Sequence, residues 1–193
     1  MEKYNVSSRS SIGNTYRQLL LNILKAGNFK NVLEIGCLRG YSSCAFLEAL
    51  NQGEDFQYTI CDPSPRLDMK LFDLCEKKDH ITLIKKPSLE VIKPGYDFIF
   101  IDGDHSIQYV PLELMLLLNI NAETMLAHDT YIQSNKYMGP PLYRYCFSRH
   151  KDYFYVDDSI FRPEEEKMRC GISFFTKRID IFDKVRPLFE GIR

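Results

Sequence analysis

The stretch 31–43, NVLEIGCLRGYSS, combines a short apolar run with one acid and a turn that contains two glycines. A parallel strand that is buried on both faces is almost continuously apolar, so Glu34 stands out near the end of this one. Gly36 and Gly40 follow it in the turn toward the next helix. Because ligands of open parallel sheets bind outside the carboxyl ends of the strands, this stretch predicts a ligand-binding edge.

The whole chain has 193 residues, of which 45% are hydrophobic and 26% are charged. This size predicts one compact domain over residues 1–193, with an N-terminal helical segment at 1–27. The formal net charge is −1 and the basic residues are scattered, which argues against nucleic acid as a partner. The longest apolar run, around 114–118, is far shorter than the roughly 20 residues of a membrane-spanning helix. We therefore expect a cytoplasmic protein without a membrane partner.

Helical and extended segments alternate along most of the chain. The expected helices are 14–26, 42–51, 66–77 and 107–119, and the expected strands are 31–35, 57–61, 80–85, 96–101 and 124–127. This alternation predicts a doubly wound α/β fold with a mostly parallel, Rossmann-like sheet. Two later strands, at 153–156 and 171–176, follow a short helix near 142–149, and we expect them to close the sheet as an antiparallel pair.

Polar residues occupy the ends of all the expected parallel strands. They are Glu34, Asp62, Ser88, the segment 102–105, His128 and Asp129. The glycine turn narrows the choice of ligand, because a dinucleotide fingerprint needs the spacing GxGxxG, whereas Gly36 and Gly40 have three residues between them and no glycine in the middle. Leu38 stands where the middle glycine would be, and the chain contains no GxxxxGK[ST] loop. An NAD-dependent oxidoreductase and a P-loop protein are therefore disfavoured.

The segment EIGCLRG at 34–40, together with Asp62 at the end of the next strand, resembles class I S-adenosylmethionine-dependent methyltransferases. The resemblance implies that Glu34 and Gly36 lie beside the amino-acid part of the cofactor, that Gly40 also belongs to the cofactor site, and that Asp62 binds the ribose. It also implies that Ser88 lies near the adenine. A carboxylate can accept both ribose hydroxyl protons, and glycine lets the backbone approach a bulky ligand. The alternatives are a partly buried salt bridge for Glu34 and a turn-forming role for Asp62.

A second stretch, YDFIFIDGDHSIQYV at 96–110, is followed by a strand that ends in HDT. This pattern resembles the metal-dependent O-methyltransferases that act on catechols and macrolide sugars. The resemblance implies that Asp102, His128 and Asp129 bind a divalent cation, with Asp102 also beside the cofactor, and that His105 is the general base. The alternative role of His105 is to cap the next helix. Relatives often present an oxygen ligand where this chain has His128, which shifts the expected ion from Mg²⁺ toward Mn²⁺ or similar ions. The alternative is a site without a metal, in which Asp129 only orients the substrate.

Together these patterns predict an S-adenosylmethionine-dependent O-methyltransferase for a small hydroxylated acceptor, such as a sugar, a phenol or a natural product. A divalent cation lowers the pKa of a bound hydroxyl, and an imidazole that titrates near neutral pH can take its proton. We expect the acceptor against an insertion at 130–150, whose tyrosines are either its walls or part of the core. A non-catalytic, methyltransferase-like binding subunit is the alternative, and the size permits a homodimer.

Overall fold

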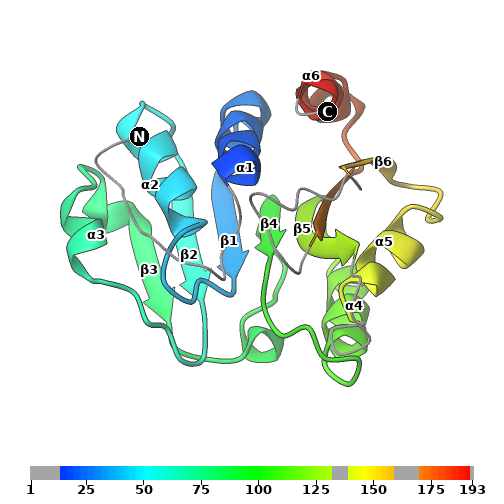
Figure 1. Cartoon of the computed structure of the whole chain (residues 1–193), viewed down its shortest axis with the longest axis horizontal. Coiled ribbons are helices and arrows are strands. Elements are labelled where there is room, and N and C mark those ends of the chain that lie inside the picture. The colour runs from blue at the N-terminus through cyan, green and yellow to red at the C-terminus, as the bar shows by residue number, and fades with distance from the viewer. Residues whose placement is uncertain (1–13, 132–138, 159–169, 192–193) are drawn as a thin grey trace.

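The computed structural model describes residues 14–131, 139–158 and 170–191, which form one seven-stranded sheet flanked by helices (Figure 1). The strands are β1 (Asn31–Ile35), β2 (Gln57–Cys61), β3 (Ile81–Ile84), β4 (Phe98–Ile101), β5 (Thr124–Tyr131), β6 (Phe154–Asp158) and β7 (Cys170–Thr176). Their spatial order is β3-β2-β1-β4-β5-β7-β6. The first five strands in this order run parallel, and β7 is antiparallel to both β5 and β6. The predicted fold is confirmed.

Helices cover both faces of the sheet. They are α1 (Asn14–Gly27), α2 (Ser43–Asn51), α3 (Lys70–Asp73), α4 (Val110–Asn119), α5 (Pro141–Phe147) and α6 (Ile179–Glu190), with short 3₁₀ turns at Lys78–His80 and Ser88–Glu90. Successive strand residues point to opposite faces, so Val32 joins the core under α1, α2 and α6 while Leu33 joins the core under α4 and α5. None of the described helices is long and apolar enough to cross a membrane.

Helix α3 is much shorter than the predicted helix 66–77. Its start follows Asp68, whose carboxylate accepts the Lys70 N–H at 3.0 Å. Beyond its end, the amide of Asn51 donates to the Leu74 carbonyl at 2.9 Å and accepts the Glu76 N–H at 2.9 Å. These bonds from a neighbouring helix satisfy backbone groups that a longer helix would have paired internally, and so they stop α3 early.

Helix α6 was not predicted. It buries Ile181, Val185 and Phe189, four residues apart along the chain, which form one apolar stripe against the sheet and α1. Pro187 lies inside this helix and weakens its sequence signal, because proline removes one internal hydrogen bond. The stripe nevertheless closes the core on the face that carries α1.

Truncating the buried stripe of α6 is expected to destabilise the fold strongly. Phe189→Ala removes a fully buried ring and should lower the free energy of unfolding by about 3–5 kcal/mol. The matched control on the same helix is Ile179→Ala, because Ile179 is half exposed and should cost well under about 1.5 kcal/mol. Urea unfolding of both variants checks this, and equal losses would contradict the assigned packing of α6.

Candidate active site

The glycine turn after β1 lies directly against the end of β4. Gly36 has a φ of +80°, and a Cβ there would lie 2.7 Å from the carbonyl carbon of Asp102 and would overlap its oxygen. The Gly36 N–H donates to the Cys61 carbonyl at 2.8 Å, and the Asp102 N–H donates to the Ile35 carbonyl at 2.8 Å. Glycine at this position therefore lets the ends of β1, β2 and β4 meet at one edge.

Asp62 holds the glycine turn in place. One carboxylate oxygen accepts the backbone N–H groups of Cys37 at 3.0 Å and Leu38 at 2.9 Å, and the other accepts the Ser64 N–H at 2.8 Å. Leu38 has a φ of +44°, so the first two bonds fix a residue in the left-handed region. The Cys37 thiol also approaches Oδ2, at 3.6 Å, so the acceptor position that a ribose hydroxyl could use is on Oδ1, which among the described residues accepts only the Ser64 N–H. Ribose binding by Asp62 stays a prediction.

Glu34 is fully buried beneath this turn rather than exposed at the edge. Its carboxyl group accepts hydrogen bonds from the hydroxyls of Ser42 at 2.5 Å, Ser43 at 2.7 Å and Tyr58. Burial raises the pKa of Glu34 to about 7, against the opposing effect of these hydroxyl donors. Glu34 thus ties the start of α2 to β1 and β2, and its predicted contact with the cofactor is untested.

Ser88 belongs to a buried polar network that the sequence analysis missed. Its hydroxyl donates to Glu113 on α4 and lies 3.0 Å from the Tyr109 hydroxyl, while Tyr143 on α5 also donates to Glu113. Burial raises the pKa of Glu113, although both hydroxyl donors act against the shift. The available signal was an acid within the otherwise apolar helix VPLELMLLLN. The predicted adenine contact of Ser88 is untested.

A β-bulge brings two consecutive side chains of β5 to the same site. The pairing with β7 shifts between His128, opposite Ile172, and Tyr131, opposite Cys170. Asp129 within this bulge has a φ of +56°, and Gly171 opposite has a φ of +94° with no room for a Cβ, which would lie 2.6 Å from that of Tyr131. In a regular strand His128 and Asp129 would face opposite sides, so the bulge is what places both beside Asp102. The strand was predicted to end at residue 127 and runs four residues further.

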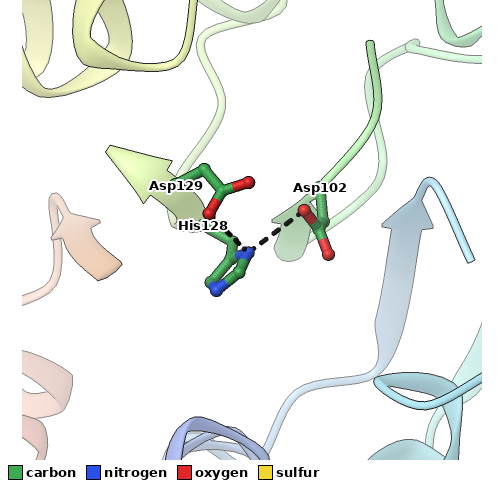
Figure 2. A group of neighbouring side chains, drawn as sticks. All are labelled: Asp102, His128 and Asp129. Atoms are coloured by element: carbon green, nitrogen blue, oxygen red, sulfur yellow. Dashed lines mark hydrogen bonds and ion pairs between the residues drawn. The ribbon is translucent and has the colours of Figure 1, made fainter. Parts of the chain in front are cut away.

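Asp102, His128 and Asp129 form a compact cluster (Figure 2). The Nδ1 atom of His128 lies 3.2 Å from Asp102 Oδ1 and 3.5 Å from Asp129 Oδ1. Nε2 of His105 lies 3.5 Å from Asp102 Oδ1 and 3.5 Å from Asp129 Oδ2. All four residues named for the metal and base roles therefore meet, although the roles themselves are untested. Burial favours the neutral form of Asp102, but the neighbouring imidazoles of His128 and His105 outweigh it and lower its pKa.

The donor set of this cluster fits a divalent cation. Two carboxylates and one imidazole offer ligand atoms that all lie within 4.8 Å of one another. Such mixed oxygen and nitrogen donors suit Mn²⁺ and similar ions, and three protein ligands leave further positions for the oxygens of an acceptor.

The acceptor-side tyrosines divide between core and surface. Tyr143 is fully buried, whereas Tyr145 is 59% exposed. Tyr131 is half-buried, and the Arg144 guanidinium stacks on its ring at 4.2 Å. Arg144 also donates to Tyr155 and to Asp157, each at 2.7 Å. Tyr137 and Met138 lie outside the described residues.

Comparison with known proteins defines the class. Residues 33–130, about half of the chain, match the family model of a methyltransferase domain, Methyltransf_24. The chain belongs to this methyltransferase family.

The similar curated proteins are plant O-methyltransferases. Caffeoyl-CoA O-methyltransferase 2 of Petunia hybrida is 25% identical over 134 residues, which cover 64% of this chain and 55% of that protein. Caffeoyl-CoA O-methyltransferase 1 of Eucalyptus globulus is 27% identical over 133 residues, which cover 64% of this chain and 54% of that protein. The chain thus spans about half the length of these relatives, and the expected resemblance to O-methyltransferases is confirmed.

Solved structures share the fold. A putative O-methyltransferase from Klebsiella pneumoniae superposes with a TM-score of 0.65 at 18% identity, over 86% of this chain and 81% of that one. An O-methyltransferase from Bacillus cereus in complex with S-adenosylhomocysteine gives a TM-score of 0.62 at 17% identity, over 86% and 82%.

Substituting Gly36 is expected to destabilise the fold by more than the strain of a positive φ alone. Gly36→Ala adds a Cβ that meets the Asp102 backbone, so the ends of β1 and β4 must separate. The matched control is Gly95→Ala, which has a φ of +110° and nothing within 4 Å of its Cβ. The control should cost about 1–2 kcal/mol of unfolding free energy and Gly36→Ala clearly more. Denaturant unfolding makes the comparison, and equal costs would argue against the close approach.

The buried Glu34 should make stability depend on pH. Its folded pKa of about 7 lies above the value of 4.5 for an exposed glutamate, so the folded state holds a proton that the unfolded state releases. Stability should therefore fall as pH rises from 4.5 to 7, by about 3 kcal/mol, and level off above that. Urea unfolding of wild type and Glu34→Gln across this range measures the difference. Parallel curves for the two proteins would refute the raised pKa.

Proposed function

We propose that this protein is an S-adenosylmethionine-dependent O-methyltransferase that acts on a small hydroxylated acceptor with the help of a divalent cation. The observation that carries the proposal is the meeting of two imidazoles and two carboxylates at the sheet edge that also holds the glycine turn. The family supports methyl transfer. The names of the curated relatives, which refer to caffeoyl-CoA, support an acceptor with a phenolic hydroxyl.

Each residue of the cluster has a distinct role in this proposal. Asp102, His128 and Asp129 would hold the cation, which supplies a lower pKa for the acceptor hydroxyl and a fixed position for its oxygen. His105 takes the hydroxyl proton at Nε2. The carboxylates of Asp102 and Asp129, each 3.5 Å from that atom, stabilise the resulting imidazolium.

The transfer itself is a single displacement. The acceptor oxygen forms a bond to the methyl carbon as the bond from that carbon to the sulfonium sulfur breaks, giving a methyl ether and S-adenosylhomocysteine. The glycine turn, held by Asp62, aligns the cofactor so that oxygen, carbon and sulfur lie in line. The burial of His128 and Asp129 keeps water from the reacting charges, which cancel during the transfer.

Substitution of His105 tests the base role. His105→Ala should lower turnover by about 10²–10⁴-fold and leave the affinity for S-adenosylhomocysteine nearly unchanged, because the imidazole acts on the acceptor and not on the cofactor. Calorimetric titration measures the affinity. Turnover is measured on catechols and hydroxylated sugars, with Mn²⁺, with Mg²⁺ and with EDTA.

His80→Ala is the matched control, because His80 lies in the 3₁₀ turn at the amino end of β3, whereas the site lies at the carboxyl ends of the strands, and the change should affect neither quantity. Equal losses of cofactor affinity and turnover in His105→Ala would overturn the base role. Tight cofactor binding by wild type without turnover on any acceptor would favour the non-catalytic binding subunit.

A further inference from the structure

The imidazole of His128 packs on α1, an element outside the family match at 33–130. The rings of Tyr16 and His128 are 5.8 Å apart at their centroids, and their planes meet at 77°, the edge-to-face arrangement that aromatic rings prefer. Figure 2 shows one ring nitrogen of His128 toward the carboxylates and the ribbon of α1 on the opposite side of the ring. Tyr16 is buried, so this contact excludes water from that side.

Tyr16 is fixed in turn by a buried carboxylate. Its hydroxyl donates to Asp158 Oδ2 at 3.1 Å, and Asp158, the last residue of β6, is fully buried. Both Asp158 and His128 pair with Ile172 of β7, one from each side. The three residues therefore form one row across the sheet, and cross-strand neighbours in a row point to the same face. The row spans two strand spacings, roughly 10 Å, and Tyr16 bridges its two ends.

We infer that Tyr16 is a positioning residue of the proposed metal site. Its ring holds the His128 imidazole so that Nδ1 faces Asp102 and Asp129, and Asp158 holds Tyr16. The inference rests on the proposed function, because it concerns the cation that these ligands would bind. Groups behind a metal-ligating histidine set the orientation of its ring, and their loss typically weakens metal binding by about 10–100-fold.

A purely structural role for Tyr16 makes a different prediction. Packing alone needs the ring but not a buried carboxylate, which is costly to bury unless it is hydrogen-bonded. A structural tyrosine would therefore change the stability of the fold and leave the affinity of the folded protein for a cation unchanged.

The test is calorimetric titration of the full chain with Mn²⁺ while the protein is saturated with S-adenosylhomocysteine. Tyr16→Leu removes the ring and should raise the dissociation constant of Mn²⁺ by about 10–100-fold. Tyr16→Phe keeps the ring and removes the hydroxyl that donates to Asp158, and Asp158→Asn weakens the same bond by removing the charge of its acceptor. Each of these two variants should raise the dissociation constant of Mn²⁺ several-fold. Circular dichroism shows whether each variant is folded. If Tyr16→Leu does not fold, the test rests on the affinities of Tyr16→Phe and Asp158→Asn.

Tyr153→Phe is the matched control. Tyr153 is also buried and also donates a hydrogen bond from its hydroxyl, to the Ala122 carbonyl before the start of β5. The Tyr153→Phe variant should be less stable than the wild type but should bind Mn²⁺ with the same affinity. Unchanged affinity in the folded Tyr16 and Asp158 variants would overturn the inference and leave the proposed function intact. Failure of the wild-type protein to bind Mn²⁺ would overturn this inference together with the metal part of the proposed function.

Discussion

The close approach of two backbones, at Gly36 and Asp102, determines how the site is assembled. The glycine turn after β1 and the acidic loop after β4 serve different ligands in the proposed reaction, and they occupy one edge because no side chain separates them. Parallel pairing brings the strand ends to a common level, and the missing Cβ lets them touch. In the proposed reaction the geometry of methyl transfer depends on this contact, since it would set the distance between cofactor and acceptor.

Five of the acids described above fall into two groups according to their partners. Glu34, Glu113 and Asp158 accept hydrogen bonds from serine and tyrosine hydroxyls, which carry no charge of their own. Asp102 and Asp129 instead lie beside imidazoles, whose charge changes with protonation. Within the first group, Glu34 and Asp158 join helices to strands, and Glu113 joins α4 to α5 and to the turn at Ser88. In the proposed function, the second group is where a proton or a cation would be exchanged.

Much of this arrangement could be predicted from sequence. Alternating apolar segments gave the sheet, and acids at strand ends meet because parallel strands converge at one edge. The partners of those acids could not be predicted. The sequence places Glu34 at the ligand-binding edge of the sheet, yet its carboxyl group is buried and accepts hydrogen bonds from Ser42, Ser43 and Tyr58. The bulge at Asp129 depends on pairing with Gly171, 42 positions further along, which no local pattern indicates. The early end of α3 likewise depends on Asn51, a residue of another helix.

Because of the bulge in β5, the parts of the fold cannot all form in the order in which the chain is synthesised. The parallel strands β1 to β5 come from residues 31–131, whereas the partner that shapes the bulge, β7, begins at Cys170. A chain emerging from the ribosome can therefore build the glycine turn and most of the parallel sheet before β7 exists. The bulge that turns His128 and Asp129 to the same side needs β7 as its pairing partner. The proposed cation site is thus completed only after β7 has been made, later than the frame that carries it.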